Sequence, residues 1–180
     1  MAMSARLKAG ETLGDRVMKV DHAGEHGAIC IYRAQRWFAR WRAPDMVEEL
    51  SDFLAHERRH RDLFGAELER RGRRRCRSWH LCGLGGFVLG AVTGFCGRRA
   101  IAATTVAIET VVLRHMREQV AELSATDPVA ADTLRNVIAD EQEHHDVSDR
   151  WLAPPGFWPK LINPVVSAST EAVIWLGMRL

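Results

Sequence analysis

The strongest constraint on the fold of this chain is a spacing of charged residues that occurs twice. The motif Glu-x-x-His is found at 57–60 and at 141–144, and nowhere else in the 180 residues. Counting back 32 residues from the glutamate of each motif reaches another glutamate, Glu25 in the first half and Glu109 in the second. Residues three apart share one face of a helix. Each half therefore predicts one helix with an inward glutamate and a second helix with an inward Glu-x-x-His.

The segments between the glycine and proline breakers have the apolar period of helices. Apolar residues recur at intervals of about 3.6 rather than at alternate positions. Asp127-Pro128 has the form of a helix N-cap followed by a first-turn proline. The sequence therefore predicts an all-α fold. The expected helices cover residues 13–41, 44–72, 98–124, 128–152 and 160–178.

Carboxylates occupy positions where these helices should bury apolar side chains. Glu57 continues the stripe formed by Leu50 and Phe53, and Glu141 continues the stripe that includes Leu134. Burying an unpaired carboxylate costs several kcal/mol, so such a residue is usually protonated, ion-paired or bound to a metal.

Together the repeated residues form the ligand set of a dinuclear carboxylate site in a four-helix bundle. In such a site two helices each supply a glutamate and the other two each supply Glu-x-x-His. Four carboxylates balance the charge of two divalent cations. The mixed oxygen and nitrogen donors exclude a thiolate zinc site and suit iron or manganese, with iron favoured for oxygen chemistry. The predicted metal ligands are Glu25, Glu57, His60, Glu109, Glu141 and His144.

An alternative interpretation is that the four glutamates form salt bridges between helices with the abundant arginines. Salt bridges do not require the repeated spacing or the histidines. The second histidine of the adjacent pair, His145, has no counterpart in the first half, where Arg61 stands at the matching position. We therefore predict that His145 flanks the site and does not bind metal.

The segment 78–97 is apolar, carries no formal charge when His80 is neutral, and is long enough to span a bilayer. A single span would place Glu57 and Glu109 on opposite sides of the membrane. We expect instead a crossover between the second and third bundle helices, as a broken helix lying against the bundle or in the bilayer surface. Arg70–Arg77, with six arginines, would lie beside anionic head groups. The alternative is a crossover buried against the last helix, with arginines that only solubilise the chain.

Length and charge limit the class of protein. A chain of 180 residues predicts one domain over 1–180, with 1–12 as a flexible N-terminus and 73–97 as the crossover. The net charge of +2 argues against nucleic acid as a partner. The N-terminal stretch has no apolar region of the kind found in export signals. The four cysteines lack CxxC spacing, so we expect reduced thiols.

Four motifs resemble the demethoxyubiquinone hydroxylase family of ubiquinone biosynthesis. They are DHAGEHGA around Glu25, the Glu-x-x-His at 57–60, Glu-Thr at 109–110 and DEQEHHD at 140–146. The resemblance extends from about Gly14 to Leu180. It implies a ferritin-like four-helix bundle with an extra C-terminal helix. It also implies a di-iron monooxygenase that hydroxylates the ring of a polyprenyl methoxy-methyl-benzoquinol with O2. The ligands it implies are the six that the spacing selects.

The resemblance also implies several finer features. Asp21 and His115 are candidates to orient ligands or relay protons, and the alternative for each is an ordinary hydrogen bond at the helix surface or in the core. Met116 stands where some relatives carry tyrosine. The cofactor would be two iron ions, and the electron donor would be the quinol or NADH. Expected partners are the polyprenyl quinol, a lipid-binding helper protein and a second copy of the chain. The expected location is peripheral, on the cytoplasmic face of a bacterial inner membrane or the matrix side of the mitochondrial inner membrane.

Two functions of other classes share this ligand set. One is iron binding or storage in a ferritin-type cage, which would elute as a large shell on sizing. The other is a dimanganese protein that destroys peroxide. The apolar, glycine-rich crossover argues against a soluble cage.

Overall fold

The computed structural model describes residues 5–154 and 156–180, and this part of the chain forms six α-helices and one short 3₁₀ turn. The expectation of an all-α fold is confirmed. The predicted flexible segment 1–12 is described only from residue 5 onward, and residues 1–4 lie outside the described residues. The helices are α1 (Leu13–Arg42), α2 (Val47–Arg70), α3 (Trp79–Cys96), α4 (Arg98–Leu123), α5 (Pro128–Arg150) and α6 (Phe157–Gly177), with the 3₁₀ turn η1 at Pro44–Met46.

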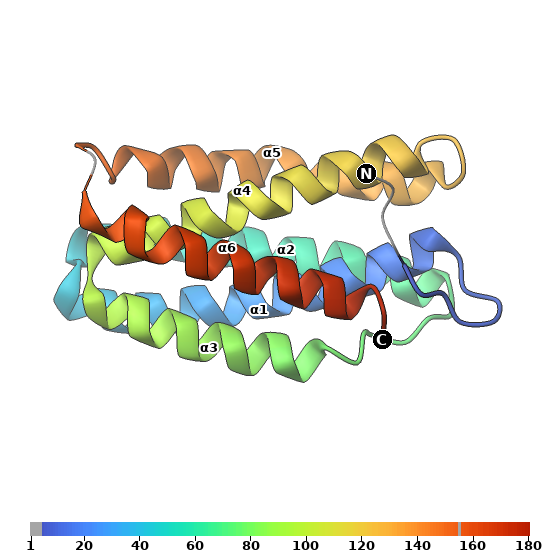
Figure 1. The fold of residues 1–180 in the computed structure, drawn as a ribbon, viewed down its shortest axis with the longest axis horizontal. Helices are drawn as coiled ribbons and strands as arrows, with labels where there is room; N and C mark the ends of the chain where they lie inside the picture. The colour runs from blue at the N-terminus through green and yellow to red at the C-terminus, as the bar shows by residue number, and fades with distance from the viewer. Residues whose placement is uncertain (1–4, 155) are drawn as a thin grey trace.

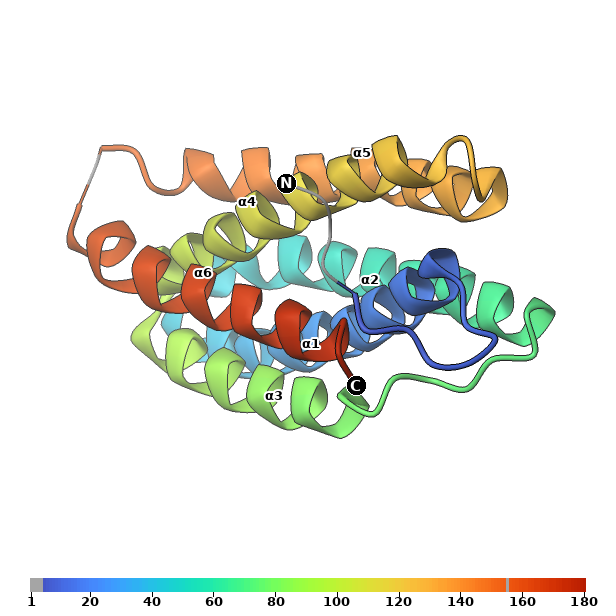
Figure 2. The same ribbon diagram turned by 45° about the vertical axis from the view of Figure 1, so that its right-hand side comes forward.

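Four of these helices form the bundle, and two cover one side of it. Helices α1 and α2 pair, as do α4 and α5, while α3 packs on α1 and α6 packs on α4 (Figures 1 and 2). This arrangement confirms the predicted four-helix bundle with a crossover helix and an extra C-terminal helix. The apolar core has two large parts along the bundle, besides a small cluster of Ala23, Cys76 and Cys82. One part contains Ile29, Phe53 and Ala103, and the other contains Val17 and Leu134.

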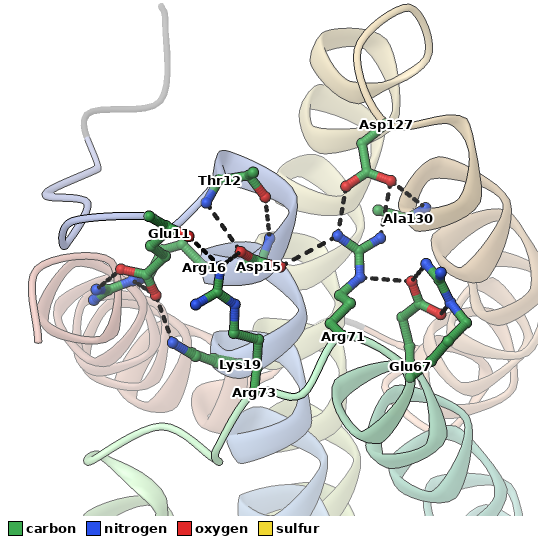
Figure 3. A network of polar contacts seen from close by, with 12 residues as sticks. Glu11, Thr12, Asp15, Arg16, Lys19, Glu67, Arg71, Arg73, Asp127 and Ala130 are labelled. Atoms are coloured by element: carbon green, nitrogen blue, oxygen red, sulfur yellow. Dashed lines mark hydrogen bonds and ion pairs between the residues drawn. The ribbon is translucent and has the colours of Figure 1, made fainter.

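Capping residues and a network of ion pairs hold the end of the bundle where α1 and α5 begin. Thr12 and Asp15 form a capping box at the start of α1, and Asp127 accepts the backbone N–H of Ala130 at the start of α5. Arg71, just after α2, binds both oxygens of Asp127 at 2.6 and 2.8 Å (Figure 3). Because Arg71 also binds Glu67 at 2.6 Å, one guanidinium joins the ends of α2 and α5.

The basic run Arg70–Arg77 is divided between this network and the surface. Arg70 and Arg71 bind Glu67, and Arg73 binds Asp15 at 2.8 Å. Arg74, Arg75 and Arg77 are exposed. At most half of the run is therefore available to an external partner.

The crossover is a continuous helix, so the prediction of a broken helix is wrong. Helix α3 runs parallel to α1 without interruption, although it contains several glycines. A Cβ atom on Gly86 or Gly90 would overlap the carbonyl oxygen of Gly27 or Ile31 on α1. These glycines allow the two helix backbones to touch, and the packing offsets the low helix propensity of glycine.

The outer surfaces of α3 and α6 are apolar. Large exposed hydrophobic side chains on α3 are Leu81, Leu84, Phe87, Val88, Val92 and Phe95, and those on α6 are Phe157, Leu161, Val165 and Trp175. By length and composition α3 could cross a membrane. It lies along the side of the bundle, however, packed on α1 (Figure 2). The alternative of a crossover buried against the last helix is wrong, because only 33% of α3 is buried and this helix packs mainly on α1.

Candidate metal centre

All six predicted ligand residues meet inside the bundle, between the two parts of the apolar core. Each of these residues is at most 5% exposed. Their donor atoms form two groups of four, within each of which all atoms lie within 4.8 Å of one another. Glu57 and Glu141 belong to both groups, so each could contribute to holding either of two metal ions. The first group is Glu25, Glu57, His60 and Glu141, and the second is Glu57, Glu109, Glu141 and His144.

Several buried atoms in this cluster make no hydrogen bond. They are both carboxylate oxygens of Glu57 and the Nδ1 atoms of His60 and His144. The His144 Nδ1 atom lies 3.3 Å from oxygens of Glu57 and Glu141, yet without hydrogen-bond geometry. Unpaired buried polar atoms are costly. Their position and their O and N chemistry fit a pair of divalent metal ions held by these residues.

The other nitrogen of each histidine is held from outside the cluster. The Nε2 atom of His60 lies 2.8 Å from Asp140 Oδ2, and the Nε2 atom of His144 lies 3.1 Å from His56 Nδ1. A hydrogen bond at Nε2 fixes the ring and leaves the Nδ1 lone pair for a metal. Neither residue is among the predicted site residues. They stand at matching positions, each directly before the glutamate of a Glu-x-x-His motif, but they differ in type, so the repeat does not mark them.

A tyrosine also supports the cluster. The Tyr32 hydroxyl donates to Glu109 Oε1 at 3.2 Å, and the ring packs edge-on against His144. Tyr32 is buried, and both its burial and the neighbouring carboxylates raise its pKa well above the usual range. It therefore remains a neutral hydrogen-bond donor.

The electrostatics of the cluster reflect its crowded negative charge. Burial, followed by repulsion from neighbouring carboxylates, raises the pKa of Glu25 and of Glu109 well above the usual range. Burial alone would lower the pKa of His144, but contact with Glu141 and Glu57 raises it to about 11. For Glu141 the effect of burial is outweighed by the adjacent imidazoles of His144 and His60, which lower its pKa. The protein holds the excess charge by sharing protons that metal ions would displace.

The alternative of interhelical salt bridges with arginine does not describe this cluster. Within the described residues, no arginine or lysine lies within ion-pair distance of any of its four glutamates. His145 points elsewhere, with its Nδ1 atom 2.9 Å from Asp146 on the exposed side of α5.

A cavity of about 280 Å³ leads from the α3 and α6 side to the cluster. Its walls are mainly apolar, as at Ile31, Leu89 and Ile108, and all four cluster glutamates line it. Asp21 and His115 also line it. The cavity is of a size and polarity suited to an apolar ring.

The two residues predicted to support the ligands face this cavity. Asp21 accepts a hydrogen bond from Gln119 at 3.4 Å, and its other oxygen is buried without a partner. Burial raises the pKa of Asp21 to about 7, opposed by that hydrogen bond. The Nε2 atom of His115 lies 2.8 Å from Glu171 of α6, while its Nδ1 atom is buried and unpaired. Neither side chain has a hydrogen bond to a cluster glutamate or histidine in the described part of the chain.

Comparisons with known proteins agree with this geometry. Residues 12–177 match the family described as ubiquinone biosynthesis protein COQ7. The NADPH-dependent 3-demethoxyubiquinone 3-hydroxylases of Dictyostelium discoideum and Mus musculus are 33% and 32% identical, with 92% of this chain and 76% or 77% of the relative covered. The 3-demethoxyubiquinol 3-hydroxylase of Rhodospirillum rubrum is 31% identical over 92% of this chain and 77% of its own length.

Proposed function

The chain belongs to the COQ7 family and is a demethoxyubiquinone hydroxylase of ubiquinone biosynthesis, and we propose that a pair of iron ions in the α1, α2, α4 and α5 cluster serves this reaction. The observation that carries the proposal is the set of two donor groups that share Glu57 and Glu141. The substrate would be a polyprenyl methoxy-methyl-benzoquinol, and O2 the co-substrate.

The six cluster residues would hold the iron ions. Two iron ions there would supply the reduction of O2 by which one oxygen atom enters the ring and the other leaves as water. The Nε2 hydrogen bonds to Asp140 and His56 hold the two imidazoles in place, and Tyr32 fixes Glu109. Two electrons are needed, from the quinol or from a nicotinamide nucleotide such as NADH. The Dictyostelium and mouse relatives are named NADPH-dependent.

The apolar cavity would bind the quinol ring and exclude water. Asp21 and His115 are the polar residues, apart from the cluster glutamates, that we propose to act on the ring oxygens or on proton movement there. The raised pKa of Asp21, about 7 through burial, allows this carboxyl to carry a proton near neutral pH. The unpaired Nδ1 atom of His115 can accept or donate one. Met116 also lines the cavity, where it can contribute only apolar contact.

The substrate carries a polyprenyl tail, which favours peripheral attachment to a membrane. The cavity is lined by α3 and α6, whose outer surfaces carry the exposed apolar side chains. We propose that these surfaces lie in the bilayer interface, on the cytoplasmic side of a bacterial inner membrane or the matrix side of the mitochondrial one. Arg74 and Arg77 are exposed and available for anionic head groups. A lipid-binding helper protein or a second copy of the chain would compete for the same apolar surface.

The other functions with this ligand set lack such support. An apolar cavity reaches the cluster from an apolar surface. Neither iron storage nor the destruction of peroxide by manganese requires such a cavity, because iron ions and peroxide are polar. The family relationship also favours quinol hydroxylation.

The test is aerobic incubation of the iron-loaded protein with a reduced short-chain demethoxyquinol, followed by mass spectrometry. We expect a product heavier by one oxygen atom. Replacing His144 by alanine should abolish both bound metal and product, whereas His145→Ala should retain most of both. Absence of product from fully loaded protein, with the quinol and with NADH as donor, would overturn the proposal. Metal analysis and peroxide turnover would identify the dimanganese alternative.

A further inference from the structure

A second pocket lies on the opposite side of the bundle from the quinol cavity. It has a volume of about 320 Å³ and lies between η1, α2 and α5. Phe53 and Val147 form its only apolar walls. Its ionisable lining residues are Asp45, Glu48, Glu49, Asp52, His56 and Glu143.

The negative charge of this pocket is only partly neutralised. Asp45 pairs with Arg98 at 2.5 Å, and Glu49 accepts the Trp151 indole N–H at 3.0 Å with one oxygen. The other oxygen of Glu49 is buried without a partner. The remaining three carboxylates, Glu48, Asp52 and Glu143, have no ion-pair partner among the described residues. A hydrated cation would therefore concentrate in this pocket.

His56 connects this pocket directly to the metal centre. Its ring stacks on that of His144, with centroids 5.3 Å apart and planes 15° apart, and its Nδ1 atom lies 3.1 Å from His144 Nε2. Donor atoms of His56, Asp140 and Glu143 lie within 4.8 Å of one another. This oxygen and nitrogen set is of the same chemistry as the inner cluster. Asp140 in turn contacts His60 and also pairs with Arg59, so the outer group contacts both histidines of the inner one and, within the described ranges, keeps Glu143 as its unpaired carboxylate.

The other route to the centre is unsuited to a metal ion. The cavity on the α3 and α6 side is lined by apolar residues such as Ile31, Leu89 and Ile108. Moving a hydrated divalent cation between such walls costs far more than moving it along carboxylates. Metal and quinol would thus reach the same centre from opposite sides.

We propose that the acidic pocket is a transient binding site for divalent iron on its way to the dinuclear centre, with His56, Asp140 and Glu143 as the donors nearest the interior. This inference rests on the proposed function, because it takes the inner cluster to be the destination of the metal. The cation exchanges water for carboxylate oxygens in the pocket and passes inward when the His56 side chain turns aside.

The test measures how fast metal loads rather than what the loaded enzyme does. Metal-free full-length protein is mixed with limiting Co²⁺, and the growth of its visible absorption bands is followed by stopped flow. The test variant combines Glu48→Gln, Asp52→Asn and Glu143→Gln. The control variant combines Glu69→Gln, Glu122→Gln and Asp132→Asn, the same change of charge at exposed positions away from the pocket. Circular dichroism melting checks that both variants fold.

We expect the pocket variant to load about tenfold more slowly at low salt, with the same final metal content per chain. The control variant should load at close to the parent rate, and the slowing should shrink as salt is raised. Equal loading rates for the two variants would overturn the proposal, as would failure of the parent to load two metals. Normal pocket-dependent loading without quinol product would instead refute the proposed reaction and leave the uptake route standing.

Discussion

At the scale of single residues, we expect Asp140 to affect how firmly His60 would hold a metal. Its carboxylate lies 2.8 Å from His60 Nε2 and fixes the ring from outside the cluster. Asp140→Asn keeps the shape but removes the charge that increases the basicity of the imidazole. Loss of such an outer partner weakens metal binding by about 10- to 100-fold, which competition with a chelator would measure.

The matched control for this change is Asp146→Asn on the same helix. Asp146 contacts His145 and Gln142 rather than a cluster residue, so the metal affinity should stay within about twofold of the parent. Equal affinities for the two variants would show that Asp140 has no effect on the centre.

The buried carboxyl of Asp21 should make the stability of the folded chain depend on pH. Burial raises its pKa to about 7 in the folded chain, against an ordinary 3.8. Below about pH 4 both states hold the proton and the residue has no effect. Between about pH 4 and 7 only the unfolded state ionises, so the fold loses stability as pH rises, and the loss is complete above about pH 7.

Asp21→Asn removes this titration and keeps the acceptor for Gln119. Relative to the parent, the metal-free variant should therefore gain free energy of unfolding between pH 4 and pH 8, on the order of a few kcal/mol. Urea titrations at both pH values give the difference. A gap between variant and parent that stays constant with pH would contradict the buried, protonated carboxyl.

The sequence identifies those site residues whose type and spacing occur in both halves of the chain. The two Glu-x-x-His motifs and the two glutamates 32 residues before them point to one another, so the pattern locates all six side chains without a structure. His56 and Asp140 stand at matching positions, as do Tyr32 and Met116, but the paired residues differ in type and so do not mark one another. The roles of His56, Asp140 and Tyr32 come from which neighbouring helix they face, and that depends on the angle and rotation at which the helices pack.

At the scale of helices, close packing of α3 on α1 depends on Gly86 and Gly90. Gly90→Ala would place a methyl group against the Ile31 carbonyl oxygen and push the helices apart. We expect a loss of one or more kcal/mol of stability, even though alanine favours a helix by about 1 kcal/mol over glycine. Gly85→Ala is the control, because its Cβ would meet nothing within 4 Å. Thermal melting should show the first variant below the parent and the second at or above it.

The same contacts explain why the crossover could not be predicted correctly. Glycines spread through an apolar segment are typical of a broken helix when only propensity is considered. Gly86, Gly90 and Gly94 are spaced four apart and so lie on one face, which is the face that meets α1. Packing of backbone against backbone outweighs propensity here, and it depends on a partner helix that is more than fifty residues away in the sequence.

At the scale of the whole molecule, the two sides of the bundle differ in chemistry. The α3 and α6 side exposes apolar residues above an apolar cavity, and the α2 and α5 side holds the acidic pocket. A cofactor that travels in water and a substrate that travels in lipid need such separate routes to one buried centre. If the apolar side lies in a membrane, the acidic pocket remains in water.

The final prediction concerns this orientation at a membrane. Leu84 and Phe87 on α3 are 67% and 57% exposed, so Leu84→Ser with Phe87→Ser should leave the fold intact. Each side chain contributes about 1–2 kcal/mol when it enters an apolar phase, so the double variant should bind anionic phospholipid vesicles at least about tenfold more weakly in flotation. The control is Leu63→Ser with Val129→Ser, two exposed apolar residues of α2 and α5.

The control variant should float like the parent, because its positions would face water. If all three proteins float equally, the apolar surface of α3 is not the membrane contact. If the α3 variant then elutes as a smaller particle than the parent in size-exclusion chromatography, a second copy of the chain covers this surface. The two results distinguish lipid from protein as its neighbour, because only lipid binding follows the vesicle concentration while only self-association follows the protein concentration.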